Sequence, residues 1–394
     1  MLEKLKKPQL DHSNYSSFTE LRLWFVEQAL PVWDRYGIDR EHGGFFERLH
    51  TDFVPSSEPR RARVVARQIY WFAAGEALGW NGPVENLIDH GLQFLRGHLV
   101  TSDGHVYASC NASGDLIDTR KHLYDAAFVL IALAKLAQRK RGQGASEIEK
   151  IACLITLQLN PHRLGGYIDE FSPGLQYANP HMHLFEAFLA WTTVSDINHD
   201  FWCQRASSLG NLALENLILS KSGLIPEHFD KTWLPLRQRG TYRIEPGHQF
   251  EWSWLLIRWA ALISDSAAAA AATAAALRMS NLAEIYGVDL NRNVVIESIT
   301  EKLQPSEYVA RLWQQTERLK AWHIQALLDP ASEASVYRNM ALKSLLSFLS
   351  GPVPGLWFDE MTPSGTFASK PVKASSGYHI ACAIEVLFDC FLSA

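Results

Sequence analysis

Residues 223–227 read Gly-Leu-Ile-Pro-Glu, and variants of this short segment return throughout the 394-residue chain. All copies but one begin with a glycine. Two or three mostly apolar or aromatic residues follow, and usually an acidic residue ends the segment. The other copies are Gly44-Phe45-Phe46-Glu47, Gly104-His105-Val106-Tyr107, Gly166-Tyr167-Ile168-Asp169, Val294-Val295-Ile296-Glu297 and Gly355-Leu356-Trp357-Phe358-Asp359. Successive copies lie roughly 60 residues apart, so six units fill the chain.

The sequence between these segments has the 3.6-residue apolar spacing of helices, with two helices in each unit. The predicted helices span residues 18–33, 63–78, 84–99, 122–138, 145–158, 183–193, 201–219, 249–264, 267–286, 306–328, 334–349 and 378–391. Six helix pairs predict an all-α toroid in which alternate helices form an inner and an outer ring. No long Pro, Gly or Ser stretch divides the chain, so we expect a single domain over residues 1–394.

Composition and charge narrow the class of protein. The chain is 47% hydrophobic, and Lys plus Arg (37) nearly balance Asp plus Glu (42). Without a basic tract, a nucleic-acid partner is not expected. No apolar run is long enough to span a membrane, and the first residues lack the hydrophobic core of a signal peptide. Five scattered cysteines without a Cys-x-x-Cys pair indicate reduced thiols. We therefore expect a cytoplasmic protein.

Polar residues recur near the start of the second helix of each pair. They are Arg67, Tyr124, His183, His248, Trp313 and His379, at intervals of 57 to 66 residues. In a toroid they would converge at one mouth, where the N–H groups of the helix starts also point. Any one of them could be an ordinary core residue, but a regular series of six predicts a site. The 13 Trp and 15 His of the chain suit stacking on sugar rings and proton transfer near neutral pH.

Two of these histidines are followed, three residues later, by a carboxylate: His183 by Glu186 and His248 by Glu251. Residues three apart share a helix face, so each carboxylate could orient its imidazole, raise its basicity or bind a sugar hydroxyl. A purely structural pair is the alternative. His181 and His183 would point about 200° apart on a helix and would not share a metal ion. We expect neither a metal nor another cofactor.

Several of these segments together resemble the N-acylglucosamine 2-epimerase superfamily. They are Arg67-Gln68, His122-Leu123-Tyr124-Asp125, Asn179-Pro180-His181-Met182-His183-Leu184-Phe185-Glu186-Ala187, Pro246-Gly247-His248-Gln249-Phe250-Glu251-Trp252, Trp313-Gln314-Gln315-Thr316-Glu317 and Tyr378-His379-Ile380. The resemblance spans nearly the whole chain. It implies an (α/α)6 barrel with short β-hairpins at one end, and metal-independent isomerisation or epimerisation of sugars.

The resemblance also implies roles for individual residues. His248 and His379 would be the acid/base pair. The residues implied to hold the sugar are Arg67, Tyr124, Asn179, His183, Glu251, Trp313 and Glu317, with Trp357 as a wall of the cavity. An arginine before the Pro-Gly-His segment also contacts sugar in relatives, and among Arg237, Arg239 and Arg243 we favour Arg243. The stretch from Tyr242 to Trp252 is most similar to the D-mannose isomerase branch.

The expected reaction is therefore the isomerisation of D-mannose to D-fructose, with D-lyxose to D-xylulose as a secondary reaction. A histidine would remove the C2 proton to give a cis-enediolate, and returning the proton to C1 would give the ketose. Delivery to C2 from the opposite face would give the epimer. An N-acylglucosamine or cellobiose 2-epimerase is thus the alternative on the same residues.

Two other classes of function stay open at this stage. A glycoside hydrolase would use Asp169 or Glu170 with Asp359 or Glu360 as its two carboxylates. A sugar-binding or protein-binding scaffold would bind without turnover. Phosphorylated sugars are less expected because the chain has no glycine-rich phosphate cradle, although an arginine cluster could replace one. The expected partner is a monosaccharide, and the protein is expected to be a monomer or a homodimer.

Overall fold

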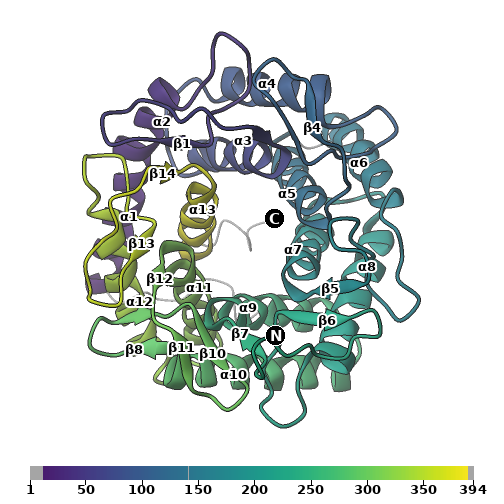
Figure 1. Cartoon of the computed structure of the whole chain (residues 1–394), viewed down its shortest axis with the longest axis vertical. Helices are drawn as coiled ribbons and strands as arrows, with labels where there is room; N and C mark the ends of the chain where they lie inside the picture. Colours follow the sequence, from purple (N-terminus) through teal and green to yellow (C-terminus); the bar gives the residue numbers. More distant parts are fainter. Residues whose placement is uncertain (1–11, 141, 389–394) are drawn as a thin grey trace. The chain divides into compact units, whose positions relative to one another are not determined.

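The computed structural model describes residues 12–140 and 142–388, and its internal contacts group these residues into two compact units. Unit 1 comprises residues 12–24, 210–370 and 382–388, and unit 2 comprises residues 25–209 and 371–381. Figure 1 labels the α-helices and most of the strands of both. The single domain over residues 1–394 stays a prediction.

Unit 2 consists of helix pairs in two layers. Its α-helices are α2 (Leu30–Tyr36), α3 (Ala62–Ala77), α4 (Val84–Phe94), α5 (Leu123–Lys140), α6 (Gly142–Leu157), α7 (Ala178–Val194), most of α8 (His199–Leu212) and the first half of α13 (Ser375–Leu387), with π-helical turns η2 (Phe25–Ala29) and η3 (Leu95–Leu99). Helix α5 packs between α3 and α7, while α4 covers α3 and α6 covers α5. The three helices α3, α5 and α7 are buried around nearly their whole circumference, as inner helices should be.

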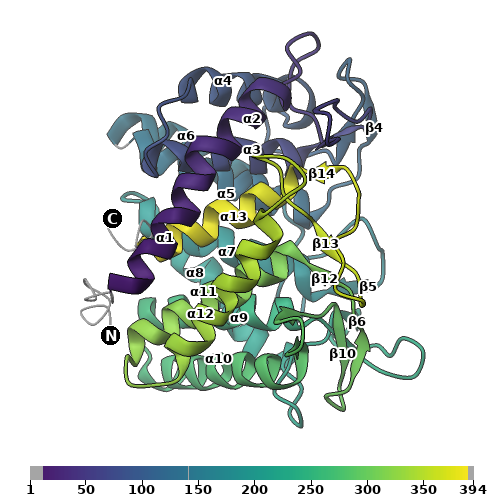
Figure 2. The same cartoon turned by 90° about the vertical axis from the view of Figure 1, so that its left-hand side faces the viewer.

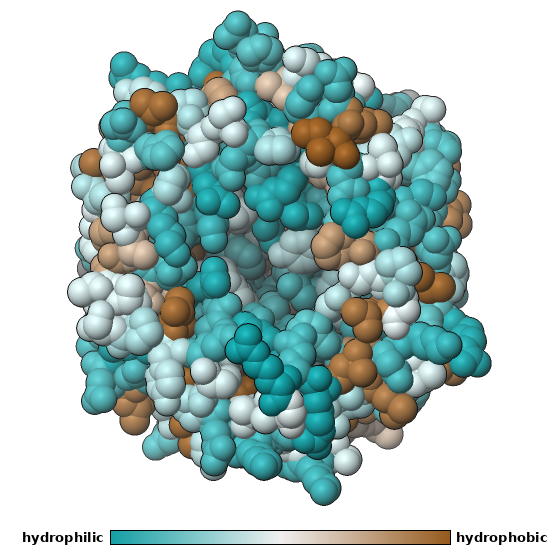
Figure 3. All heavy atoms as spheres, in the orientation of Figure 1, coloured by the Kyte–Doolittle hydropathy of each residue, from teal (hydrophilic) through white to brown (hydrophobic). Residues whose placement is uncertain are grey.

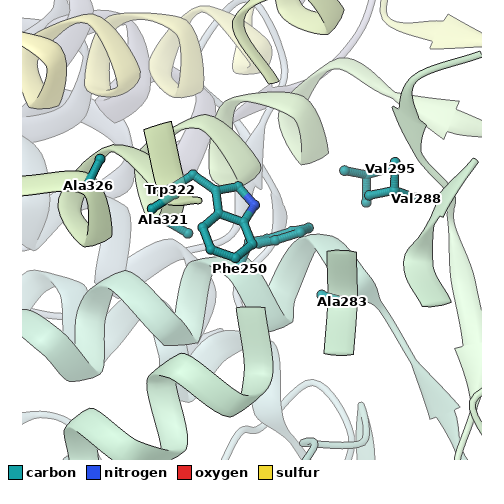
Figure 4. Close-up of a cluster of buried hydrophobic side chains, with 8 residues drawn as sticks. Phe250, Ala283, Val288, Val295, Ala321, Trp322 and Ala326 are labelled. Atoms are coloured by element: carbon teal, nitrogen blue, oxygen red, sulfur yellow. The ribbon is translucent and has the colours of Figure 1, made fainter. Parts of the chain in front are cut away.

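Unit 1 repeats this two-layer plan. Its helices are α1 (His12–Trp24), α9 (Pro246–Leu262), α10 (Ser266–Gly287), α11 (Leu312–Leu328) and α12 (Ala334–Leu349), with the π-helical turn η4 (Ala213–Leu217). Helix α9 packs on α10 and α11, and α11 packs on α12. Between the layers lies a hydrophobic cluster that includes Phe250, Ala283, Val295 and Trp322 (Figure 4). Within each unit, the predicted alternation of inner and outer helices is confirmed.

Short strands occupy the connections into the inner helices. They are β1 (Arg48–Leu49), β2 (Arg60–Arg61), β3 (Ser109–Cys110), β4 (Leu116–Asp118), β5 (Leu175–Tyr177) and β14 (Val372–Lys373) in unit 2, and β6 (His228–Asp230), β7 (Arg243–Ile244), β8 (Val288–Asp289), β9 (Val294–Val295), β10 (Ser298–Thr300), β11 (Pro305–Glu307), β12 (Ala310–Arg311) and β13 (Glu360–Met361) in unit 1. In unit 2, β1 pairs with β14 and β3 lies between β2 and β4, all antiparallel. In unit 1, β10 lies between β7 and β11, and Figure 2 shows β10, β12 and β13 near the same end of the unit.

The repeated segment of the sequence depends on a left-handed backbone at its first residue. Gly44, Gly104, Gly166, Gly223 and Gly355 all have positive φ, between 69° and 94°. The copy without a glycine has Asn293 at this place, with a φ of 52°. Asparagine is one of the few residues that tolerate this conformation. The backbone geometry therefore explains both the recurring glycine and its one replacement.

In unit 1, a glutamine side chain joins two of these segments to the helix that follows each of them. The side-chain amide of Gln249, the fourth residue of α9, accepts the Ile225 N–H and donates to the Ile225 carbonyl (both 2.9 Å). Gln315, the fourth residue of α11, makes the same two bonds to Val295 (2.9 and 3.3 Å). Each amide also donates to the carbonyl of the residue just before its helix. These bonds satisfy buried backbone groups that would otherwise lack partners.

His181 does in α7 what glutamine does in α9 and α11. It is also the fourth residue of its helix, and its Nε2 accepts the Tyr167 N–H (3.0 Å) while its Nδ1 donates to the Tyr177 carbonyl (2.8 Å). Burial lowers the pKa of this imidazole to about 4, so it stays neutral. His181 is thus a structural residue, and it points away from His183, as its spacing predicted.

Most predicted helices are confirmed, with one clear error at the helix expected over residues 306–328. That helix, α11, begins at Leu312, because Pro305–Glu307 forms β11 and Arg311 is still extended (φ −114°, ψ 151°). Residues 389–391 of the last predicted helix lie outside the described residues. Helix α9 begins at Pro246, the usual place for proline in a helix.

The cysteines form no disulfide among the described residues, and the face of the molecule in Figure 3 is mainly hydrophilic. Cys110, Cys153, Cys203 and Cys382 are free, and Cys390 lies outside the described residues. On the face drawn in Figure 3, hydrophilic residues predominate and hydrophobic ones form small separate patches. In the part of the chain that the structure describes, no helix combines the length and apolarity needed to cross a membrane.

Candidate active site

The predicted site residues lie at the starts of the inner helices, on two levels. Tyr124, Asn179 and Trp313 are the second residues of α5, α7 and α11, and His248 is the third residue of α9. The sixth residues are Arg67 in α3, His183 in α7, Glu251 in α9 and Glu317 in α11. Positions two and six are four residues apart and share a helix face. His379 is the fifth residue of α13. The six residues predicted as one series thus occupy positions two, three, five and six of their helices and not one equivalent position.

In unit 2, Arg67 is a buried cation surrounded by aromatic rings. Its guanidinium donates to the Tyr124 hydroxyl (2.7 Å) and lies 3.7 Å from the ring centroid of Phe128. Only 6% of Arg67 is exposed, and no carboxylate among the described residues forms an ion pair with it. Its Nε has no hydrogen-bond partner within residues 12–140 and 142–388. A buried guanidinium with unused donors is suited to bind oxygen atoms of a ligand.

Arg67 lines a pocket of about 640 Å³ that belongs entirely to unit 2. The pocket is lined by Arg61, Arg63, Arg67, Ala108, Ser109, Asp118, His122, Tyr124, Asp169, Phe171, Tyr177, Asn179 and Pro180. Two of its arginines are neutralised, because Arg61 pairs with Glu47 and Arg63 pairs with the buried Asp125. The buried Oδ1 of Asn179 has no partner among the described residues. The pocket thus offers both a donor and an acceptor to a polyhydroxylated ligand.

Deeper in unit 2, two histidines lie near one another. The ring centroids of His183 and His379 are 6.5 Å apart, and the Nδ1 of His183 lies 3.0 Å from a carboxylate oxygen of Glu186. The other oxygen of Glu186 accepts the Tyr378 hydroxyl (2.6 Å). All of these side chains are buried, with His379 6% exposed. The pairing of His183 with Glu186 on one helix face is confirmed.

In unit 1, His248 is held by carboxylates rather than by rings. Its Nδ1 lies 2.9 Å from Glu227 and 3.5 Å from Glu245. Burial alone would lower the pKa of His248, but the negative charges of Glu227 and Glu245 outweigh it and raise the pKa to about 10. Burial raises the pKa of the Glu245 carboxyl. His248 is therefore an imidazolium at neutral pH.

The ring of Trp313 covers His248, and a glycine makes room for it. The two ring centroids are 4.8 Å apart, with an interplanar angle of 34°. A Cβ at Gly247 would lie 2.7 Å from the Cγ of Gln314 and 2.8 Å from the Trp313 ring, so a larger residue would displace both side chains. The Pro-Gly-His sequence therefore serves close packing at the start of α9. Gly247 itself does not have a positive φ.

Glu317, one turn deeper than Trp313, is part of a buried charged group. Its carboxylate accepts the Trp254 Nε1–H (3.2 Å) and pairs with Lys320 (2.7 Å), and both charged residues are fully buried. The Lys320 ammonium also lies 4.3 Å from the Trp254 ring centroid. Breaking a buried ion pair is costly, so this group fixes Glu317 in one position. Glu251 is likewise fully buried in α9.

Two residues to which the resemblance assigned sugar contact, Arg243 and Trp357, are occupied by contacts with other protein side chains. Arg243 bonds Glu245 (3.1 Å), Glu307 (2.8 Å) and Glu297 (3.4 Å), which engages all three of its nitrogens. Trp357 is 1% exposed, and its ring packs edge-to-face on Trp24 of α1 (6.3 Å). Sugar contact by either residue stays a prediction.

One cluster of unit 1 offers ligand atoms to a metal ion. Glu227, Glu245 and His248 each have a donor atom within 4.8 Å of the others. Two carboxylates and an imidazole are ligands for zinc or manganese. Arg243 forms an ion pair with Glu245 at 3.1 Å, and this cation already neutralises part of the cluster. The two carboxylates can therefore stabilise a protonated His248 as well as they could bind a metal ion together with a neutral His248.

Some residues that shape the site could not be identified as functional from the sequence. Glu227 is the acid of a repeated segment, but its contact with His248 joins residues 21 apart in sequence. Lys320 looks like an ordinary helix residue, although it is three residues after Glu317, the spacing of an ion pair. Phe128 is the sixth residue of α5, the same position that Arg67 has in α3 and His183 has in α7. This shared position is the sequence signal that could have identified Phe128.

Comparison with known proteins identifies the class. A Rhizobium meliloti protein named mannose-6-phosphate isomerase is 37% identical over 94% of this chain and 96% of its own length. A Thermobifida fusca D-mannose isomerase is 25% identical over 72% of this chain and 75% of its own. A crystal structure of a D-mannose isomerase has a TM-score of 0.83 at 18% identity, covering 98% of this chain and all of the other. The fold is thus the (α/α)6 barrel of sugar isomerases and epimerases.

The model of the N-acylglucosamine 2-epimerase (GlcNAc 2-epimerase) family matches residues 44–383. The chain belongs to this family, and it is a sugar isomerase or epimerase. The fold and the family expected from the sequence are confirmed.

Proposed function

We propose that the enzyme isomerises D-mannose to D-fructose, with D-lyxose to D-xylulose as a secondary reaction. The observation that carries this proposal is the buried contact of His248 with Glu227, whose carboxylate lies 2.9 Å from the Nδ1 of His248. A positioned proton donor is what the carbonyl oxygen of an open-chain aldose requires as C2 loses its proton. The name of the 25%-identical relative, D-mannose isomerase, supports the choice of sugar.

In the proposed mechanism, His379 is the base and His248 is the acid. His379 takes the proton from C2 while His248 protonates O1, which gives a neutral cis-enediol by way of the enediolate. His379 then returns its proton to C1, and His248 recovers a proton from O2 as the C2 carbonyl forms. A cis-enediolate has O1 and O2 on the same side, so one imidazole can serve both oxygens. His248 suits the acid role because its carboxylate partners keep it protonated at neutral pH.

In this proposal the sugar is bound by the buried polar groups of the inner helices. Arg67 and Asn179 are the strongest candidates, because each has a buried polar atom without a partner among the described residues. Trp313 would stack on the sugar beside His248, and Glu317 would accept a hydroxyl from its fixed position. Tyr124, His183 and Glu251 complete the proposed set.

A second candidate substrate is D-mannose 6-phosphate. The 37%-identical relative is named for this reaction, and the pocket of unit 2 contains three arginines. Of these three, Arg67 is the one that forms no ion pair with a carboxylate in the described part of the chain, so it could pair with a phosphate. We place the neutral sugar first because Arg61 and Arg63 already have carboxylate partners.

A panel of sugars tests the proposal. The purified enzyme is incubated with D-mannose, D-mannose 6-phosphate, D-lyxose, N-acetylglucosamine and cellobiose, and the products are identified by NMR. We expect fructose from mannose as the fastest reaction. Fructose 6-phosphate as the fastest product would replace the neutral substrate with the phosphorylated one. N-acetylmannosamine from N-acetylglucosamine, or an epimer of cellobiose, would establish an epimerase. Glucose released from cellobiose would establish a hydrolase.

A further inference from the structure

We propose that Glu186 is a positioning residue that orients both His183 and His379. The inference rests on the proposed function for its catalytic consequence, but its structural part can be tested without any substrate. Glu186 lies on α7 and is only 3% exposed. Its two carboxylate oxygens receive different donors, His183 from its own helix and Tyr378 from α13.

The first consequence concerns the tautomer of His183. An ionised carboxylate only accepts hydrogen bonds, so the Nδ1 that faces Glu186 at 3.0 Å must carry a hydrogen. In a neutral imidazole, Nε2 then has the lone pair and can accept a bond from a sugar hydroxyl. The aromatic rings of Tyr124 and Phe128 lie 5.1 and 4.6 Å from the His183 ring and fill the space on their side. Glu186 therefore fixes which nitrogen of His183 can accept.

The second consequence concerns His379, the residue that directly follows Tyr378. The Tyr378 hydroxyl donates to Glu186 at 2.6 Å, and the Tyr378 ring packs edge-on against Phe128 and Tyr70. Tyr378 is the fourth residue of α13, so this bond ties the first turn of α13 to α7. The position of the His379 imidazole depends on that turn. Loss of the bond would release the base proposed for the C2 proton.

The cost of burial argues that this carboxylate has a task beyond filling space. A buried charge is unfavourable unless it is well hydrogen-bonded, and an apolar side chain of similar size would pack among these rings without that cost. Glu186 instead joins two predicted site histidines. The same unit contains a matched carboxylate away from them, Glu149, which is 4% exposed and accepts bonds from Ser195 and Trp202.

Four variants test the proposal: Glu186→Gln, Glu186→Asp, Tyr378→Phe and, as the control, Glu149→Gln. Long-range ¹H–¹⁵N NMR of the ligand-free enzyme reports which ring nitrogen of His183 carries hydrogen, and His183→Asn identifies its signals. In the wild type we expect hydrogen on Nδ1. Glu186→Gln can donate its amide to Nδ1 and should shift the hydrogen to Nε2, whereas Glu149→Gln should leave the His183 signals unchanged.

Kinetics separate positioning from general stability. We expect Glu186→Gln to lower kcat by about 10²-fold or more, since a wrongly set tautomer is severely damaging in other histidine enzymes. Tyr378→Phe, which removes one hydrogen bond to a charged group, should lower kcat by about 10-fold to 100-fold. Glu186→Asp keeps the charge and should recover part of the loss. The KM should change far less, and Glu149→Gln should keep kcat while losing thermal stability.

The outcomes distinguish this inference from the proposed function. A lone pair on Nδ1 of wild-type His183, or a normal kcat in Glu186→Gln, would overturn the positioning role even if mannose is the substrate. If the enzyme turns over a different sugar, the same NMR comparison and the same kcat ratios apply to that sugar. A similar loss of kcat in Glu149→Gln would reduce Glu186 to a structural residue.

Discussion

His248 in unit 1 and His183 in unit 2 both present Nδ1 to a buried glutamate, but their other neighbours differ. His248 has a second carboxylate, Glu245, at 3.5 Å, and its pKa rises to about 10. Within its own unit, His183 is packed against the rings of Tyr124 and Phe128. The carboxylates keep His248 protonated, whereas the neighbours of His183 hold its imidazole in one orientation. The comparison shows that the environment of a histidine, more than its place near a helix start, determines what it can do.

The largest effect is expected at the two proposed acid/base residues. His248→Asn and His379→Asn should each lower turnover by roughly 10²-fold to 10⁴-fold, the usual contribution of a positioned acid or base. Substrate binding should change little, since the sugar-binding residues stay in place. Steady-state kinetics measures both quantities, and the exposed His50→Asn serves as the control. Near wild-type turnover in either variant would remove that histidine from the mechanism and leave His183 as the next candidate.

The carboxylate that charges His248 comes next. Removing the negative charge in Glu227→Gln should lower the pKa of His248, because that charge is the largest influence raising it. If His248 must be protonated, the alkaline limb of the kcat–pH profile should move to lower pH, and kcat should fall by about 10-fold to 100-fold. Glu301→Gln, a change in the same unit at an ion pair with Arg237, is the control. An unmoved alkaline limb would show that the Glu227 charge does not govern the proton on His248.

A third histidine, His323, sharpens the comparison because it is buried among apolar neighbours. His323 in α11 is 1% exposed, neither ring nitrogen has a hydrogen-bond partner among the described residues, and its ring packs edge-on against Phe18. Burial, together with the positive charge of Arg338, lowers its pKa to about 3. The unfolded chain binds a proton here below about pH 6.5 and the folded chain does not. The free energy of unfolding that depends on neutral His323 is therefore fully present above that pH and is lost as the pH falls toward 3.

His323→Phe should remove this acid sensitivity. Between pH 7 and pH 5, the wild type should lose about 2 kcal/mol more unfolding free energy than the variant, because one pKa unit corresponds to about 1.4 kcal/mol. Urea unfolding at the two pH values measures the difference. Equal pH dependence in both proteins would mean that His323 is hydrated or hydrogen-bonded in the folded state.

The smallest effect is expected from metal removal. Glu227, Glu245 and His248 could bind a cation, but the proposed mechanism uses His248 as an imidazolium. Activity should therefore survive exhaustive EDTA treatment, with kcat unchanged. Complete loss that a divalent cation restores would turn the cluster into a metal site and exclude His248 as the acid.

The sequence was sufficient for the parts of the fold that depend on local patterns. Glycines with positive φ, apolar spacing and the opposite directions of His181 and His183 follow from backbone geometry. The start of α11 was misjudged because β11 (Pro305–Glu307) pairs with the nearby β10, and Ala310 and Arg311 pair with the distant Met361 and Glu360.

The chemistry of the site was less accessible to prediction, because it depends on contacts between elements. Nothing local to His248 indicates that Glu227, from the preceding segment, will charge it. The link between Glu186 and Tyr378 joins residues 192 positions apart. Such contacts need the fold before they can be recognised, whereas the residue types that make them were visible in the sequence.

The most direct test of proton transfer by His379 and His248 is NMR of D-mannose incubated with the enzyme in deuterated buffer. We expect fructose with deuterium at C1, and mannose recovered with deuterium at C2, from the wild type. His379→Asn should abolish both labels, and His248→Asn should suppress fructose while allowing slow exchange at C2. Fructose formed by the wild type without any solvent deuterium, even at long times, would contradict this mechanism and indicate direct transfer of hydrogen between C2 and C1.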